Sequence, residues 1–557
     1  MNADAPDTPA VATIAGSVHD AATGAPLPAW VCITASDGTV VGDWNVDDSL
    51  HGFPCDGSFT AEVPAGPVRV EIHRLLSHEW AADEFVVEAG QICERTYALR
   101  PWVDLHGLGY FCGESHNHIN HPTRPEDVVL YCRALGLDYV NVCQGWMHAR
   151  DENARTSGRQ MAAALERHST EDFALHFGAE RPKTRYGHVW WWHLAPFERP
   201  FGEYDGWHDS NYFAVSGSIT EDVADIRARF PFHNELPFKT WKRYRDRGAA
   251  CAIAHPTSWW TNNDDATLIA TNIAAELPFA LLAGDLADAM VVMGYDPEQV
   301  FYQNMWFHVL NEGYDPPAVA ETDGSLRGRH HIGQILGYVQ TPDGGYSQAG
   351  IVEGVRRGRV VVSSGPFVTL TADDGAHQTG DHVPAGGEPH ELLVRAWSSP
   401  KPDEFISYVV IFRNGEIFRK IDLTAERPRR WETSIAVTEG DERAWYVAKV
   451  YGSTWPREDV FCDVMEYCRL CEREPHFEYA REIREVAFTN PIYFVPAGWE
   501  PPKPVTCDCT IRVVAGATVR VLNYDQELAA YVADGSGVIR CEMPPTALLF
   551  QNKHKAD

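Results

Sequence analysis

Histidines and carboxylates stand at the ends of apolar runs in the central part of this chain. Each of these runs is short and apolar enough to be a buried strand. In a sheet of parallel strands, the loops at the carboxyl ends surround one crevice, so polar side chains placed there converge. The residues in such positions are His116, His118, Glu180, His188, His255 and Asp323.

Imidazole nitrogens and carboxylate oxygens are a ligand set suited to Zn²⁺, Mn²⁺ or Fe²⁺. A divalent ion held in this way lowers the pKa of bound water and polarises a carbonyl or phosphoryl oxygen. Taken singly, a His-x-His pair is often incidental in a chain with 24 histidines, and Glu180 could be a surface carboxylate. The order of all six residues and their repeated position at strand ends predict a metal centre with hydrolytic chemistry.

Three further polar residues lie beside these candidates. His121 follows the His-x-His pair and is a candidate proton donor or outer ligand. Arg181 and Arg185 flank the segment from Glu180 to His188 and could bind a carboxylate or phosphate through paired hydrogen bonds. The alternative for both arginines is a solvated loop charge.

Residues 190–192 are three consecutive tryptophans, which alternate between strand faces and are expected in the core.

A strand–helix rhythm over residues 101–360 must position these side chains. Thr123-x-x-Glu126 is a capping box that predicts a helix ending at Gly136. Further helices are expected over 237–247 and 296–313, each followed by an apolar strand. Repeated helix-then-strand units predict a parallel sheet, and about 250 residues are enough to close one into a barrel.

The flanking regions have the alternation of β-strands instead. Residues 12–100 carry short alternating runs between turn signals, and Asn414-Gly415 between two such runs predicts a hairpin. A helical pattern over 464–485 is expected to be an insertion. The predicted fold class is therefore multidomain α/β plus β, with a β-sandwich at 1–100, a β/α barrel at 101–360, a second sandwich at 361–496 and a short β module at 497–557.

Composition limits the partners of the protein. The 557 residues carry a net charge of −31, which disfavours nucleic acid or an anionic membrane as a partner. The start of the chain lacks the features of a signal peptide, so we expect a cytoplasmic protein, or a periplasmic or secreted one if a leader was removed. A small-molecule substrate fits this composition, and nothing in it addresses the oligomeric state.

The 13 cysteines are scattered along the chain. Cys132 and Cys251 stand in apolar runs and are expected to be buried thiols. Four others could together hold a structural zinc, although their loose spacing favours ordinary thiols; these are Cys468, Cys471, Cys507 and Cys509.

The segments GESHNHIN, GAERPKTRYGHVWWWHL, AIAHP and ETDGS occur in the order found in the PHP (polymerase and histidinol phosphatase) superfamily. The chain most resembles its CehA/McbA-type metallohydrolases, and GRVVVSSGPFVTL is typical of that group. The segment GSVHDAATGAPLPAWV resembles a carboxypeptidase-regulatory-like sandwich. The resemblance implies a distorted β/α barrel with the six residues named above as metal ligands.

Two positions depart from the family pattern. The Asp-His pair expected after the second strand is absent from residues 141–146, and Ser325 stands where a second histidine is usual. One or two ions, of Zn, Mn or Fe, are therefore expected rather than three.

The predicted function is hydrolysis of an ester, amide or carbamate bond of a small molecule by metal-activated water, with Asp323 or His121 moving protons. A phosphoesterase or a glycan-directed hydrolase could use the same site. A catalytically inactive binding or scaffold protein is the alternative of another class.

Overall fold

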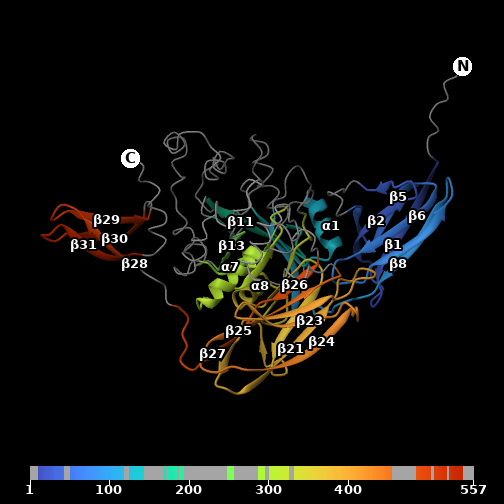
Figure 1. Ribbon diagram of the computed structural model, residues 1–557. Coiled ribbons are helices and arrows are strands. Elements are labelled where there is room, and N and C mark those ends of the chain that lie inside the picture. Colours follow the sequence, from blue (N-terminus) through green and yellow to red (C-terminus); the bar gives the residue numbers. More distant parts are fainter. Residues whose placement is uncertain are drawn as a thin grey trace, which may run out of the picture.

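In the residues that it describes, the computed structural model is mostly β-sheet with few helices, arranged as several sheets in more than one domain (Figure 1). No helix of the described residues has the length and apolar character that crossing a membrane requires. The structure describes residues 10–42, 51–117, 125–143, 167–170, 173–184, 187–192, 248–255, 287–294, 300–324, 331–453, 485–502, 507–523 and 526–543.

The amino-terminal strands form two sheets, of three and five strands. Buried and exposed residues alternate along β1, as expected where one sheet face packs on the other and one meets water. Ile14, Val31 and Val70 lie fully buried between the sheets. The strands are β1 (Val11–Asp20), β2 (Pro28–Ala35), β3 (Val40–Val41), β4 (Phe53–Asp56), β5 (Ser58–Pro64), β6 (Gly66–His73), β7 (Ala81–Val87) and β8 (Ile92–Leu99).

The central strands belong to a fifteen-stranded sheet, in the order β15-β14-β13-β12-β11-β10-β9. Neighbouring strands pair in parallel except at β12, which is antiparallel to both β11 and β13. The bounds are β9 (Tyr110–Asn117), β10 (Tyr139–Cys143), β11 (Ala174–Thr184), β12 (Gly187–Trp192), β13 (Ala250–Ala254), β14 (Ala289–Gly294) and β15 (Ala318–Glu321).

The prediction of a wholly parallel sheet was wrong at β12. Only residues 185–186 separate β11 from β12. A link this short reverses the chain into an antiparallel neighbour, because a parallel crossover needs a dozen or more residues. The six other strands still point the same way, so their carboxyl ends share one edge.

This run of strands curls until its two outer members meet. A parallel bridge joins Asn117, at the end of β9, to Gly324, just beyond β15. The Asp323 amide also donates to the His116 carbonyl at 3.0 Å. No continuous ladder links β9 and β15 within the described ranges, so the sheet is curled there without being a closed barrel.

Helices cover the outside of the curled sheet. Residues Ala250–Ala254 of β13 and Ala289–Gly294 of β14 are buried throughout, as parallel strands covered on both faces must be. The described helices are α1 (Pro125–Leu135), α7 (Val300–Asn311) and α8 (Gln348–Arg356). The helix predicted to end at Gly136 is α1, and the helix predicted over 296–313 contains α7. The predicted capping residue of α1, Thr123, and the helix predicted over 237–247 lie outside the described residues.

The sheet continues beyond β9 as β16-β17-β26-β25-β22-β23, and a four-stranded sheet, β19-β18-β21-β24, packs on this part. The Asn414-Gly415 hairpin prediction is confirmed: both residues have positive φ, as a type I′ turn requires, and they join β22 to β23. The bounds are β16 (Leu336–Gln340), β17 (Val360–Ser363), β18 (Phe367–Ala372), β19 (His377–Gln378), β20 (His382–Ala385), β21 (Pro389–Trp397), β22 (Tyr408–Arg413), β23 (Glu416–Asp422), β24 (Arg430–Thr438), β25 (Ala444–Tyr451), β26 (Val486–Thr489) and β27 (Ile492–Pro496).

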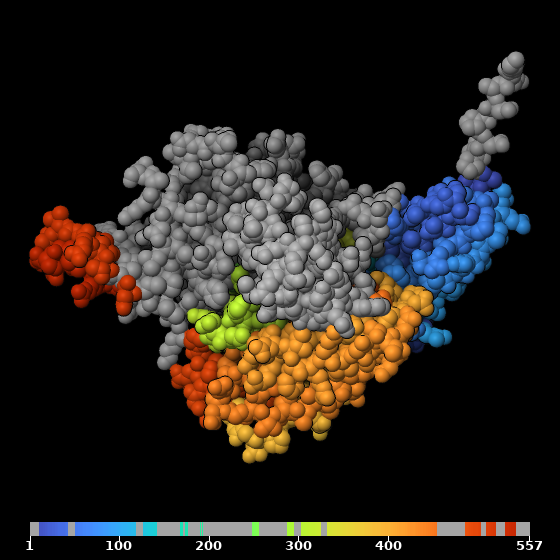
Figure 2. Space-filling view, viewed as in Figure 1, coloured from blue at the N-terminus to red at the C-terminus, as the bar shows by residue number. Residues whose placement is uncertain are grey.

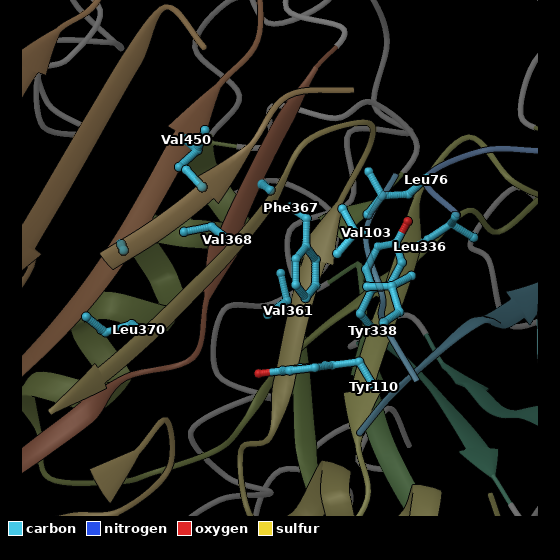
Figure 3. Close-up of a cluster of buried hydrophobic side chains, with 14 of the residues drawn as sticks. Leu76, Val103, Tyr110, Leu336, Tyr338, Val361, Phe367, Val368, Leu370 and Val450 are labelled. Atoms are coloured by element: carbon cyan, nitrogen blue, oxygen red, sulfur yellow. The ribbon is translucent and has the colours of Figure 1, made fainter. Parts of the chain in front are cut away.

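One hydrophobic core joins the three parts of the chain described so far. Figure 3 shows Leu76 from the amino-terminal part, Tyr110 from the curled sheet, Tyr338 from the continuation of that sheet, and Phe367 and Val450 from the carboxyl-terminal sandwich in a single cluster. The Tyr110 and Phe367 rings meet edge to face at 5.2 Å. Burial of this shared surface fixes the flanking sheets against the curled one.

The last strands form a separate small body with its own core, at the far end of the molecule from β1–β8 (Figure 2). Cys509 lies opposite Cys541 in the antiparallel pairing of the first and last strands of this body. Cys468, Cys471 and the helical pattern over 464–484 lie outside the described residues. Cys132 and Cys251 are buried free thiols, as predicted. The strands are β28 (Cys507–Arg512), β29 (Thr518–Asn523), β30 (Gln526–Val532) and β31 (Val538–Met543).

Replacing Trp30 tests how the amino-terminal sheets are held to the rest of the chain. Trp30 lies on β2 and is fully buried, with its ring edge to face on Tyr131 of α1 at 5.1 Å. We expect Trp30→Ala to lower the free energy of unfolding by about 3–5 kcal/mol, because it leaves a cavity at this junction. Urea unfolding measures the change. Val86→Ala, at a residue 64% exposed, is the control and should change it by less than about 0.5 kcal/mol; equal values for both variants would contradict the prediction.

Candidate metal centre

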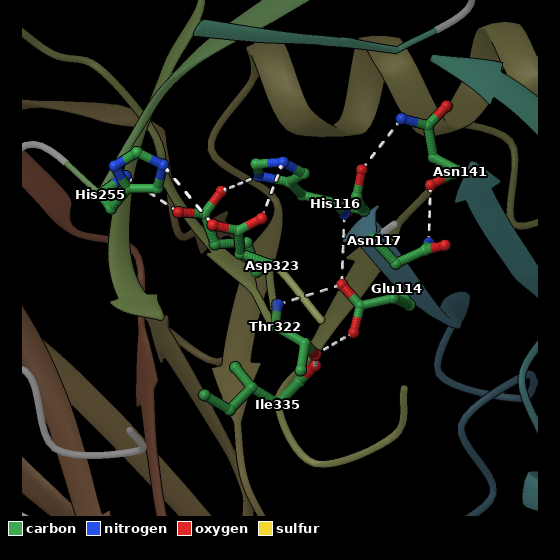
Figure 4. Close-up of polar contacts among 10 residues, drawn as sticks. Glu114, His116, Asn117, Asn141, His255, Thr322, Asp323 and Ile335 are labelled. Carbon is green, nitrogen blue, oxygen red and sulfur yellow. Dashed lines mark hydrogen bonds and ion pairs between the residues drawn. The ribbon is translucent and has the colours of Figure 1, made fainter. Parts of the chain in front are cut away.

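Three of the predicted residues meet where β9, β13 and β15 end. His116 is the penultimate residue of β9, His255 directly follows β13, and Asp323 lies two residues beyond β15. His116 Nε2 is 3.4 Å from Asp323 Oδ1, and His255 Nε2 is 3.6 Å from Asp323 Oδ2. Figure 4 shows the two rings on either side of the carboxylate, each facing one of its oxygens.

The backbone at this site is strained. His255 and Asp323 have φ angles of 24° and 48°, in the left-handed region that residues with a Cβ rarely adopt. Such conformations cost of order 1–3 kcal/mol each and collect at functional sites. Both residues stand at the point where a strand ends and the chain leaves the sheet.

A β-bulge redirects His116 in the same way. In the pairing of β9 with β10, Glu114 lies opposite Val140 but Asn117 lies opposite Val142, so β9 carries one extra residue. A bulge of this kind re-aims the side chains around it. The His116 ring consequently lies over Trp190, at 5.7 Å between ring centroids, whereas Glu114 points to Thr322.

The site is closed off from bulk water. His116 is 0% exposed, His255 1%, and the Asp323 side chain 11%. Trp190 and Trp192 pack together beneath the site with 3.7 Å between their ring centroids, and both are buried, which confirms the prediction that they belong to the core. Charges in such surroundings interact far more strongly than they do in water.

A fully buried carboxylate, Glu321, contacts both histidines. Its Oε2 lies 2.5 Å from His116 Nδ1, and its Oε1 accepts a hydrogen bond from the His255 amide at 2.9 Å. With Nδ1 as the donor to this carboxylate, Nε2 is the nitrogen of His116 that faces Asp323. This arrangement is typical of metal-ligating histidines, whose second nitrogen is held by a carboxylate or carbonyl.

A second buried carboxylate ties β9 to β15. The Glu114 side chain accepts from the Thr322 hydroxyl and from the amides of Thr322 and His116, both at 3.2 Å. Burial raises the pKa of Glu114 to about 7, and these hydrogen bonds oppose that rise. Its oxygens are used in holding the two strands together, so we assign it a structural role.

Two asparagines occupy the neighbouring strand ends. Asn141 Nδ2 donates to the Ser115 carbonyl at 2.9 Å, and Asn117 Nδ2 donates to the Asn141 carbonyl at 2.8 Å. These bonds link β9 and β10 around the bulge. Asn141 is the first residue of the segment 141–146, from which the expected Asp-His pair is absent. Its side-chain amide donates to a backbone carbonyl of β9.

The other predicted site residues are only partly placed. His118, His121 and Arg185 lie outside the described residues. Glu180, Arg181 and His188 are described by their backbone alone: His188 pairs with Ala254, next to His255, and Glu180 pairs with Trp190. Glu180 was expected after a strand ending at residue 177, but β11 continues to Thr184 and contains it, because β11 and β12 form a hairpin.

The described residues thus bring together three of the six expected ligands. Donor atoms around a tetrahedral ion with bonds of about 2.0–2.1 Å lie about 3.4 Å apart, close to the two separations found here. Two imidazoles and one carboxylate are also donors that Zn²⁺, Mn²⁺ and Fe²⁺ accept. Even so, within the described part of the chain no three histidine, cysteine, aspartate or glutamate side chains form a group that could hold an ion as it stands. A metal centre here would therefore need ligands beyond His116, His255 and Asp323.

Sequence reasoning missed Glu321, Glu114 and Thr322. Glu114 and Glu321 carry a signal of their own, since each follows an apolar run and lies two residues before a candidate ligand. A carboxylate inside a buried strand needs a specific partner. That rule finds both residues, although only the fold reveals what they contact.

A scan of protein-family models and a search of curated proteins give no match. Among solved structures, the Bacillus anthracis TIE protein is 14% identical over 20% of this chain and 20% of its own, with a TM-score of 0.13. A CARDB domain from Pyrococcus furiosus is 12% identical over 24% of this chain and 94% of its own, at 0.13. The Bacteroides uniformis β-glucuronidase is 9% identical over 77% of this chain and 57% of its own, at 0.19. The chain spans about a fifth of the TIE protein, and scores this low carry no argument about function.

Thr322 allows a test of the link between the strands. Thr322→Val removes the hydroxyl that Glu114 accepts from and leaves a buried carboxyl with one partner fewer. We expect a loss of about 1–3 kcal/mol in the free energy of unfolding, measured in urea. Thr322→Ser keeps the hydroxyl and should recover most of that loss; a valine variant as stable as the parent protein would show that the contact contributes nothing.

Proposed function

We propose that this protein is a metal-dependent hydrolase of the PHP superfamily, related to the CehA/McbA type, that cleaves an ester, amide or carbamate bond of a small molecule. The observation that supports it is the meeting of His116 and His255 on the two oxygens of Asp323, with Glu321 holding the far nitrogen of His116. The sequence order of the ligand candidates and the curl of parallel strands around them agree with a distorted barrel of that superfamily.

In this proposal His116, His255 and Asp323 bind one or two divalent ions, together with His118, Glu180 and His188. The ion supplies Lewis acidity, which polarises the scissile carbonyl and makes a water molecule acidic near neutral pH. Asp323 lies between the two imidazoles and is the candidate to accept a proton, and His121 is the candidate donor to the leaving group. Arg181 and Arg185 are the candidates for binding an anionic part of the substrate.

Metal content is the first test. We expect the purified protein to carry one or two ions of Zn, Mn or Fe per chain, and His116→Ala and His255→Ala to lose them, by elemental mass spectrometry. His308→Ala, at an exposed position on α7, is the matched control and should retain the metal. A parent protein that stays metal-free after growth and incubation with these ions would overturn the proposal and favour an inactive binding or scaffold protein.

Asp323 provides the test of catalysis. If its carboxylate accepts a proton in the reaction, Asp323→Asn should lower kcat by about 10²–10⁴-fold. Rates on aryl esters, aryl carbamates and aryl phosphates, measured with the metal content of each sample, separate acyl from phosphoryl hydrolysis. Turnover of aryl phosphates alone would indicate a phosphoesterase in place of the proposed acyl hydrolase. Turnover of aryl glycosides alone would indicate a glycan-directed enzyme.

A further inference from the structure

We propose that Glu321 is the positioning residue of this site, because one buried carboxylate fixes the ring of His116 and the backbone of His255 at the same time. The inference rests on the proposed function, since it assigns Glu321 a role toward the proposed metal ligands without making it a ligand. The ligand and proton-transfer candidates taken from the sequence did not include this residue.

The first support is the geometry of the contacts. The two oxygens of Glu321 serve two different strands, with Oε2 on His116 of β9 and Oε1 on the amide of His255 after β13. Glu321 itself is the last residue of β15, two residues before Asp323. One side chain therefore links all three strand ends that carry the described ligands.

The second support is the chemistry of the imidazole. A histidine binds a metal through a nitrogen that carries no proton, so the proton must be held on the other nitrogen. Glu321 accepts at His116 Nδ1, which selects the tautomer with Nε2 as the ligand atom. The His255 amide is held by the same carboxylate, which favours the left-handed backbone conformation of that residue.

The third support is the space made for this carboxylate. Gly294, the last residue of β14, pairs with Glu321 across the parallel ladder. A Cβ added at Gly294 would lie 3.2 Å from Glu321 Cγ and 3.4 Å from Glu321 Oε1. No φ in the left-handed region requires glycine there, so a side chain at Gly294 would disturb Glu321 and, at 3.4 Å, Val291 Cγ1.

A buried ion pair with a purely structural purpose would make the same contact with His116. The two roles differ in what a conservative replacement does. An amide cannot accept hydrogen bonds at both ends as a carboxylate does, so Glu321→Gln keeps the volume but loses one of the two contacts. A structural role predicts a change in stability with zinc affinity unchanged, whereas a positioning role predicts a loss of zinc affinity together with the change in the His116 tautomer.

The experiment compares four single variants with the parent protein. Glu321→Gln removes the double acceptor, and Gly294→Ala crowds it without changing any polar group. Gly337→Ala is the matched control, because its added Cβ would have no heavy atom nearer than 3.9 Å. Glu432→Gln is the charge control, at a side chain that is 59% exposed.

Zinc affinity is measured by competition with a chromophoric chelator, and the His116 tautomer by nitrogen-15 NMR of histidine-labelled protein. The His116 signals are assigned by their absence from His116→Ala. We expect Glu321→Gln to bind zinc about 10–100-fold more weakly than the parent protein, Gly294→Ala to lose less, and both controls to match the parent protein. The Nδ1-protonated form of His116 should dominate in the parent protein and not in Glu321→Gln.

Failure of this inference is distinguishable from failure of the proposed function. If the parent protein binds zinc and Glu321→Gln binds it equally well, Glu321 does not position the ligands and the hydrolase proposal stands. If the parent protein binds no zinc, the hydrolase proposal falls, and the positioning role of Glu321, which rests on it, falls with it.

Discussion

The buried Glu321 carboxylate is the constraint around which the central part of this protein is arranged. Its side chain is 0% exposed, and an ionised group without water is costly unless it is paired and hydrogen-bonded. Its partners come from β9 and from the residue after β13, which are distant in sequence. The sheet satisfies the carboxylate only when it curls enough to bring these strand ends together.

The curl depends on the direction of the strands. Six of the seven strands from β9 to β15 run the same way, so their carboxyl ends form one rim on which His116, His255 and Asp323 stand. The reversed strand β12 contributes Trp190 and Trp192, which fill the space beneath the rim. Glu114 and Thr322 then hold the two outer strands to each other.

The flanking sheets support this rim from outside. Beyond β9 the sheet continues through β16 and β17 into the carboxyl-terminal sandwich without a break in pairing. Asn490, after β26, holds the start of β15 by accepting from the Ala318 amide at 2.7 Å and donating to the Ala318 carbonyl at 2.9 Å. The strand that carries Glu321 and precedes Asp323 is thus fixed at both ends, so the carboxyl-terminal sandwich is part of the scaffold of the site.

The sequence by itself determined those features that depend on residues close together in the chain. The helix α1 with its end at Gly136, the Asn414-Gly415 turn, the buried Cys132 and Cys251 and the strand ends bearing His116 and His255 follow from capping and turn chemistry, apolar spacing and the order of the residues. Only the tertiary structure decided what depends on contacts between distant segments: the reversal at β12, the bulge that turns His116 toward Trp190, and the pairing of Glu321 with both histidines. A charged residue in a buried strand predicts that it has a partner. Only the curl of the sheet determines which residue lies close enough to be that partner.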